Sequence, residues 1–158
     1  QAAAAGHIEV LREFTTIGRL DYMDICLTAA DIENNQLDVI KFIIEEIKPN
    51  TLDYTVIASE TNKKKPLEYL ISKGADPIRL SCYFLAIGGN KKLAEALFSN
   101  YTKDKTEWIR SKISQNIFTQ IKTFITHGLL DKNDVYKIAV EMNNTLIMDE
   151  LEKILVLK

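Results

Sequence analysis

The stretch NKKKPLEYLISKG, residues 62–74, contains the pattern that decides the fold. It opens on the turn-prone Asn62 and places Leu67 and Leu70 five and eight positions later. Side chains three or four positions apart share one face of an α-helix, so these leucines mark an apolar helical stripe. Gly74, twelve positions after Asn62, supplies the left-handed backbone that commonly ends a helix. The stretch therefore predicts a helix, beginning near Lys64, between a turn and a glycine cap.

The same pattern recurs along the chain with a period of 27 residues. Six turn residues stand 29, 27, 27, 27 and 27 positions apart, and they are Gly6, Asn35, Asn62, Gly89, Asn116 and Asn143. Eight positions after them stand Phe14, Ile43, Leu70, Leu97, Phe124 and Leu151, a column without a polar member. Shorter apolar stretches precede the turn residues, for example at 54–59, 82–87 and 136–142. Each repeat therefore predicts a helical hairpin with a shorter first helix and a longer second one.

A pair of helices this short cannot bury its apolar face alone, so successive hairpins must stack. We therefore expect an all-α solenoid of helix-turn-helix repeats that forms a single domain over residues 1–158. The repeats are expected at about 1–18 (partial), 22–48, 53–74, 79–100, 105–128 and 133–158. Helical patterns that run up to both ends predict a fragment of a longer chain.

Composition excludes several classes of protein. The 158 residues carry 20 basic and 22 acidic side chains, for a net charge of −2, and 46% of them are hydrophobic. This balance argues against a disordered chain and against a strongly basic nucleic-acid binder. No apolar run approaches the roughly 20 residues that cross a bilayer. The two cysteines, Cys26 and Cys82, are too few for a disulfide framework and indicate a reducing compartment.

Three stretches resemble ankyrin repeats. Residues 2–11, AAAAGHIEVL, look like an Ala-rich inner helix, a Gly-His turn and an apolar outer helix; LISKGAD, residues 70–76, resembles the outer-helix end and the Gly-Ala-Asp start of the following loop. NQLDVIKFII, residues 35–44, is similar again. The family's Thr-Pro-Leu-His opening is missing, and repeats of 27 residues instead of about 33 leave little room for its β-hairpin loop. The resemblance is therefore to diverged ankyrin repeats with short loops. Tetratricopeptide or HEAT repeats are the alternative.

The sequence offers no motif for catalysis or for a cofactor. It contains no Gly-rich phosphate loop, no Gly-x-Ser-x-Gly and no Cys or His pair with the spacing of metal ligands. Cys26 and Cys82 fall on first-helix segments and are expected to be buried as small hydrophobic residues. We therefore expect no catalytic residue, no metal and no cofactor.

Aromatic residues near the starts of successive first helices are candidates for partner binding. Tyr54, Tyr83, Trp108 and Tyr136 stand six to eight positions before their turn residues. Tyr and Trp dominate binding hot spots. Trp108 follows the polar run 102–107 and is expected to be the most exposed, whereas core packing is favoured for Tyr83 and Tyr136. Polar residues at the first-helix ends complete the expected contact set: Glu33, Asn34, Glu60, Thr61, Ser114, Gln115 and Glu141.

Lysines gather where two second helices begin. Lys63, Lys64 and Lys65 open one of these helices, and Lys91 and Lys92 occupy matching positions in the next repeat. Cations at a helix N-terminus oppose the helix dipole, so local stability does not explain them. Stacked repeats would align them in a ridge that could bind an acidic protein, an anionic lipid headgroup or a phosphate. A merely solvated surface is the alternative.

The resemblance to ankyrin repeats implies a non-catalytic protein-protein interaction module that acts as a scaffold. Such a module binds a protein partner and no nucleic acid, and we expect a cytoplasmic monomer. Diverged ankyrin proteins are common as effectors of intracellular bacteria, which act in the host cytoplasm, and in large DNA viruses. Three alternatives stay open: the targeting arm of a multidomain enzyme, membrane-surface or anion binding through the lysines, and a structural spacer.

Overall fold

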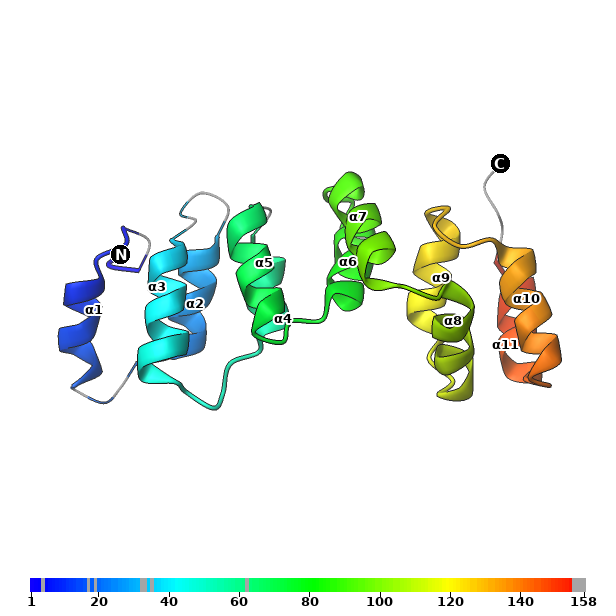
Figure 1. Ribbon diagram of the computed structural model, residues 1–158, viewed down its shortest axis with the longest axis horizontal. Helices are drawn as coiled ribbons and strands as arrows, with labels where there is room; N and C mark the ends of the chain where they lie inside the picture. Colours follow the sequence, from blue (N-terminus) through cyan, green and yellow to red (C-terminus); the bar gives the residue numbers. More distant parts are fainter. Residues whose placement is uncertain are drawn as a thin grey trace. The chain divides into compact units, whose positions relative to one another are not determined.

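A computed structural model describes residues 1–3, 5–16, 18, 20–31, 34, 36–61 and 63–154. All regular secondary structure in these residues is helical, which confirms the all-α class (Figure 1). None of the described helices has the length and apolarity that a membrane span needs. The chain divides into two compact units, Gln1–Pro77 (unit 1) and Ile78–Lys158 (unit 2), and each is described by itself. The single domain and the continuous solenoid stay predictions.

First and second helices alternate along the chain. Unit 1 contains α1 (Ile8–Thr15), α2 (Tyr22–Ala30), α3 (Leu37–Phe42), the π-helix η1 (Ile43–Ile47) that continues α3, α4 (Tyr54–Ser59) and α5 (Lys64–Ser72). Then follow α6 (Pro77–Ala86), α7 (Lys91–Tyr101), α8 (Lys105–Ser114), α9 (Phe118–Thr126), α10 (Lys132–Glu141) and α11 (Thr145–Glu152). The even-numbered helices α2, α4, α6, α8 and α10 are first helices, and the odd-numbered helices are second helices, with η1 continuing α3.

The second helices begin where the sequence pattern places them. They start at residues 8, 37, 64, 91, 118 and 145, each two positions after a predicted turn residue. Gly6, Asn116 and Asn143 have the expected positive φ of 73°, 54° and 53°. In the second of the described turns the left-handed residue is Gly88 and not Gly89, because α6 ends one position earlier relative to the turn. Asn35 and Asn62 lie outside the described residues.

Aspartates fix the starts of the first helices. The carboxylate of Asp53, for example, accepts hydrogen bonds from the amides of Thr55 and Val56 at 2.9 and 3.1 Å. Asp21, Asp104 and Asp131 cap their helices in the same way. A side-chain oxygen at this position satisfies amides that have no partner inside the helix, and each cap stabilises its helix by about 1 kcal/mol.

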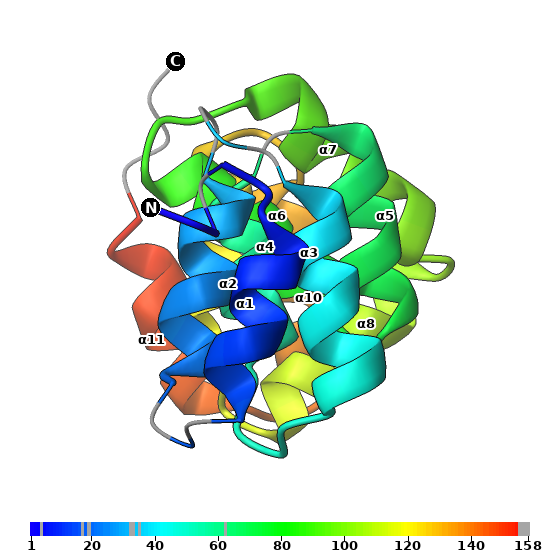
Figure 2. The same ribbon diagram turned by 90° about the vertical axis from the view of Figure 1, so that its left-hand side faces the viewer.

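Within unit 1, like helices lie beside like helices. The first helix α2 contacts both its own second helix α3 and the next first helix α4, and α1 contacts α3. Figure 2 shows α1 in front of α2 and α3. Ile40, Ile43 and Leu70 are fully buried between these layers.

Consecutive glutamates on η1 reach two different second helices of unit 1. The Glu46 carboxylate accepts a hydrogen bond from Arg12 on α1 at 2.6 Å. Glu45 accepts one from the hydroxyl of Tyr69 on α5 at 2.9 Å and lies 3.2 Å from the Lys73 ammonium. The Tyr69 hydroxyl and then Lys73 hold the pKa of Glu45 below its ordinary value. These contacts tie α1, η1 and α5 together along one face.

Unit 2 repeats the arrangement of unit 1. The first helices α8 and α10 contact each other, and so do the second helices α9 and α11. In the hairpin before them, the buried Ser81 hydroxyl on α6 donates to the Ala94 carbonyl on α7 at 2.6 Å. Two rings, Phe98 on α7 and Phe124 on α9, stack with centroids 4.3 Å apart. Both units are therefore built from hairpins that stack side by side.

Candidate binding groove

A groove of about 390 Å³ runs between the first helices α8 and α10 of unit 2. Its floor is apolar and contains the buried side chains of Ile109, Leu130 and Ile138. The helices are held in place by the contacts of α10 with both α8 and α11.

The walls of the groove carry charges of both signs. Arg110 on α8 and Glu141 on α10 form an ion pair across it. On α10, Lys137 lies 3.5 Å from the Asp134 carboxylate. The Lys105 ammonium lies 5.4 Å from the centroid of the Phe98 ring. A surface with an apolar floor and paired, partly exposed charges suits a protein segment that brings an apolar side chain flanked by charged ones.

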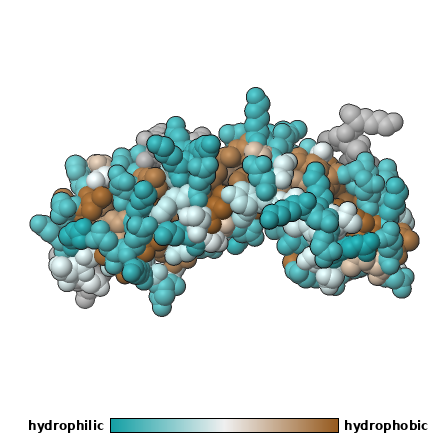
Figure 3. Space-filling model, in the orientation of Figure 1, coloured by the Kyte–Doolittle hydropathy of each residue, from teal (hydrophilic) through white to brown (hydrophobic). Residues whose placement is uncertain are grey.

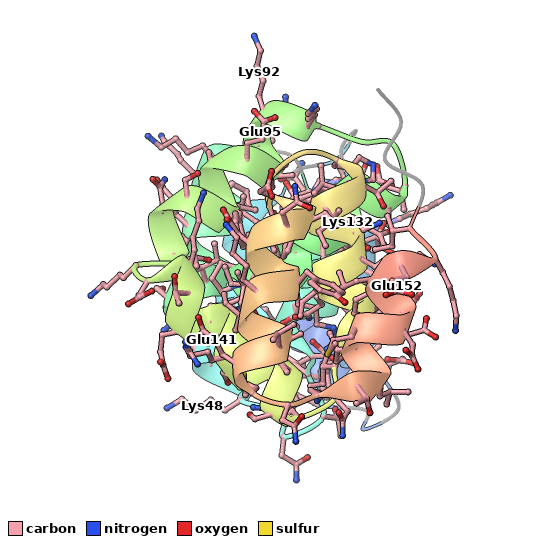
Figure 4. The ribbon with its side chains drawn as sticks, turned by 90° about the vertical axis from the view of Figure 1, so that its right-hand side faces the viewer. Lys48, Lys92, Glu95, Lys132, Glu141 and Glu152 are labelled. Atoms are coloured by element: carbon pink, nitrogen blue, oxygen red, sulfur yellow. The ribbon has the colours of Figure 1, made fainter. Side chains whose placement is uncertain are left out.

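The two ends of α10 are visible in Figure 4. Glu141 lies at the C-terminal end, where the groove is closed by its pair with Arg110, and Lys132 lies at the N-terminal end. Lys132 donates to the Ile154 carbonyl at 2.8 Å, so its side chain serves the packing of α10 against the end of α11. Glu141 is the one residue of the predicted contact set that lines the groove.

Helix geometry explains which first-helix positions are available. From Asn62 on, the position six residues before each turn residue is occupied by Val56, Tyr83, Arg110 and Lys137, and all four are exposed or half-buried. Before Asn35 this position is Ala29, which is fully buried. Successive residues on a helix point about 100° apart. Positions seven and eight residues before the turn therefore point elsewhere, toward the neighbouring helices.

Trp108 is half-buried, and the expectation that it is the most exposed of the four aromatic residues is wrong. Its ring makes edge contacts with Phe98 and Phe124, with both centroids 5.6 Å away. It stands eight positions before its turn residue, in the column that also contains the fully buried Ser81 and Val135. Trp108 therefore joins α8 to two successive second helices.

The other three aromatic residues differ from one another in exposure. Tyr83, for which core packing was favoured, is 40% exposed and is the most accessible of the set. Tyr54 and Tyr136 are half-buried, and the Tyr136 hydroxyl lies 3.5 Å from the Glu152 carboxylate on α11. The structure does not bring the four residues together into one site.

Some of the polar residues predicted to contact a partner are exposed, whereas others are buried or hydrogen-bonded to the backbone of this chain. Thr61 is buried, contrary to its expected role, because its hydroxyl accepts a hydrogen bond from the Lys63 amide at 3.2 Å in the turn before α5. Asn34 donates to the Thr28 carbonyl at 2.9 Å and ties its turn to α2. Glu60 is half-buried, whereas the side chains at the ends of α8 and α10 are exposed, namely Ser114, Gln115 and Glu141. Glu33 lies outside the described residues.

The lysines are exposed and belong to different units. Lys63, Lys64 and Lys65 lie in unit 1, and Lys91 and Lys92 in unit 2, so the ridge stays a prediction. Lys64 and Lys91 each lie 3.7 Å from a glutamate four positions on, Glu68 and Glu95. The Lys92 side chain extends away from α7 (Figure 4). Exposed pairs of this kind contribute little to stability.

Sequence reasoning missed most of the groove. Arg110 and Lys137 stand 27 positions apart, as do the acidic residues Glu107 and Asp134. A comparison of charged positions at the period of the apolar columns would have found these residues. Three of these four residues, Arg110, Asp134 and Lys137, line the groove.

The described residues contain no group of three or more His, Cys, Asp and Glu side chains placed to hold a metal ion. Cys26 on α2 is buried, as expected, and Cys82 on α6 is half-buried. Burial raises the pKa of the Cys26 thiol to about 12.

We expect the Cys26 thiol of the folded protein to resist alkylation at pH 8, because the thiolate is the reactive form. Mass spectrometry after a short iodoacetamide pulse should find Cys26 unmodified, and the same pulse in denaturant should modify it. As the pH rises, the thiol of Cys26 loses its proton at a lower pH in the unfolded chain than in the folded protein. The contribution of Cys26 to the free energy of unfolding therefore falls as the pH rises from about 8.5 toward 12. Rapid labelling of Cys26 in the native protein would contradict its burial.

Comparisons with protein-family models, with curated proteins and with solved structures found no match to this chain.

Proposed function

We propose that this chain is a non-catalytic protein-protein interaction module and that the groove between α8 and α10 is its binding site. The observation that carries the proposal is a groove of about 390 Å³ with an apolar floor and charged walls, which lies between two packed helices. A partner that docks on packed helices does not have to order a loop, so less of the binding free energy is lost.

The repeat architecture supports a scaffold of the ankyrin-like kind. Second helices start with a period of 27 residues after the first interval, and like helices contact like helices inside each unit. Stacked hairpins of this type present a continuous row of first-helix positions to a partner. We propose that Tyr83, Arg110 and Lys137 belong to that row and that the binding takes place in the cytoplasm.

Binding of an anion or of a membrane surface through the lysines has less support. Two of the five lysines, Lys64 and Lys91, lie beside glutamates on their own helices, which reduces the local positive charge. The groove, by contrast, combines an apolar floor with charges from two helices.

Exchange of the charges across the groove tests the proposal. In the double variant Arg110→Glu with Glu141→Arg, the ion pair and the net charge are kept while the polarity of the two walls is inverted. We expect at least a tenfold loss of affinity for the partner, since each misplaced charge at an interface costs more than about 1.4 kcal/mol. Affinity capture with the tagged full chain, followed by titration of the captured protein, measures the change.

A matched exchange on α11 serves as the control. Glu150 and Lys153 form an exposed pair at 2.6 Å outside the groove, so Glu150→Lys with Lys153→Glu should leave both folding and binding unchanged. Equal capture by the wild type and both exchanged variants would show that the groove is not the binding site.

A further inference from the structure

Charged side chains of both signs line the groove between α8 and α10, and most of them pair with each other. Arg110 pairs with Glu141, and the Lys137 ammonium lies 3.5 Å from the Asp134 carboxylate. In Figure 3, hydrophobic surface is visible between hydrophilic side chains where Figure 1 places these two helices. Each of these four charged residues therefore has a partner within unit 2.

Two charged residues of the lining, Lys105 and Asp131, have no such ion pair among the described residues. The Lys105 ammonium lies 5.4 Å from the centroid of the Phe98 ring, and the residue is exposed. Lys132 stands at the same position of the next repeat, but its ammonium donates to the Ile154 carbonyl at 2.8 Å. Lys105 is the first residue of α8, where a positive charge opposes the helix dipole, so the stability of this helix does not explain it.

Asp131 is the N-cap of α10 and uses one of its carboxylate oxygens for that role. Its Oδ1 atom accepts hydrogen bonds from the amides of Asn133 and Asp134 at 2.8 and 3.2 Å. The other oxygen accepts no hydrogen bond from a residue that the structure describes, so a basic group of a partner can bind there. Because α9 returns the chain between them, α8 and α10 run in the same direction, and Lys105 and Asp131 lie at the same end of the groove.

The apolar floor of the groove begins about one helical turn from this end. Ile109 follows Lys105 by four positions along α8, and it is buried in the floor together with Leu130 and Ile138. A groove between two parallel helices fits the rounded face of a third helix. A helix docked there would place an apolar side chain over the floor and charged side chains one turn away from it.

We propose that the occupant of the groove is a single α-helix of a protein partner, with an apolar anchor residue and, one turn away from it, an acidic residue next to a basic one. Adjacent positions on a helix point about 100° apart, so the acidic side chain contacts Lys105 on α8 while the basic one contacts Asp131 on α10. The acidic side chain also lies at the positive end of the α8 dipole. This inference names the partner of the groove and rests on the proposed function.

Selection of displayed helical peptides tests the inference. A library of alanine-based helices with randomised residues is selected on the full chain and, in parallel, on the variant Lys105→Glu. The full chain should enrich helices with the acidic-basic pair one turn from a leucine or an aromatic residue, and the variant should enrich helices with a basic residue in place of the acidic one. A peptide selected by the full chain should lose at least about tenfold in affinity for the variant and regain it when its acidic residue is replaced by lysine.

Two further variants serve as controls. Lys92→Glu makes the same change of charge near the start of α7, outside the groove, and should bind the selected peptides as the wild type does. Asp131→Asn keeps a residue that caps helices well, so α10 should stay folded while the preference for the basic residue of the peptide is lost.

The outcomes separate this inference from the proposed function. The methyl signals of Ile109, Leu130 and Ile138 locate a bound peptide by nuclear magnetic resonance. Peptides that shift these signals but bind the Lys105→Glu variant equally well would overturn the inference alone, whereas peptides that leave these signals unchanged would overturn the proposed function as well. Selection without any enriched helix would also overturn the inference, and the charge exchange of Arg110 and Glu141 would still decide whether the groove binds another kind of segment.

Discussion

Replacing Trp108 by alanine should lower the free energy of unfolding by about 3 kcal/mol, near the lower end of the range for Trp truncations in protein cores. The indole ring makes edge contacts with Phe98 and Phe124, each at 5.6 Å between centroids. Its removal opens a space between α8 and two second helices and takes one ring contact away from each phenylalanine. Urea denaturation followed by circular dichroism measures the loss.

Tyr83 provides the matched control for Trp108. It is a large aromatic residue on the first helix α6, but it is 40% exposed. Tyr83→Ala should therefore change the free energy of unfolding by no more than about 0.5 kcal/mol. Equal stability of the Trp108→Ala variant and the wild type would place Trp108 on the surface and would contradict the packing described for unit 2.

Replacing Phe124 by alanine should cost about 4 kcal/mol of unfolding free energy, the largest effect that we expect of a single substitution in this chain. Phe124 is fully buried and stacks on Phe98 with centroids 4.3 Å apart. The neighbouring side chains cannot move in to fill the cavity that the truncation leaves, because Phe98 and Trp108 lie on other helices, α7 and α8.

Phe14 occupies the same repeat position as Phe124 but lies at the uncovered face of α1. The variant Phe14→Ala should therefore lower the free energy of unfolding by less than about 1.5 kcal/mol, roughly half or less of a core truncation. Chemical denaturation of the two variants in parallel checks the difference. Similar losses at both positions would mean that the face of α1 that carries Phe14 is covered in solution.

The second helices could be predicted from sequence because more than one feature of the sequence marks each of them. The six turn residues and the apolar column eight positions after them repeat together, and α5 begins at Lys64 as expected. The starts of the first helices were harder to predict. Their aspartate caps at Asp21, Asp53, Asp104 and Asp131 are spaced irregularly, so they are not visible in a search for one period.

Whether a side chain on a first helix points to solvent or to a neighbouring helix can be predicted only when the position of each residue relative to the turn residue is taken into account. Tyr83 and Trp108 were grouped because they stand six and eight positions before their turn residues, yet two positions on a helix differ by about 200° in direction. Tyr83 is 40% exposed, whereas the half-buried Trp108 packs against Phe98 and Phe124. Thr61 likewise reads as a polar helix end, whereas its hydroxyl is used by the backbone of the turn.

The groove depends on pairs of helices and could not be read from one repeat. Arg110 meets Glu141 across 31 positions of sequence, and the floor combines Ile109 of α8 with Ile138 of α10. Only the knowledge that first helices stack on first helices brings these residues together. The contacts of Glu45 and Glu46 could not be read from one repeat either, because these neighbours in sequence contact different helices.

The central claim is that successive hairpins stack so that each first helix packs against second helices on both sides of the hairpin boundary. Nuclear Overhauser effects from the indole protons of Trp108, in protein with labelled phenylalanine, test this claim most directly. We predict cross-peaks to the ring protons of both Phe98 on α7 and Phe124 on α9, since each centroid lies 5.6 Å away. An indole ring with cross-peaks to neither phenylalanine would contradict the stacked architecture.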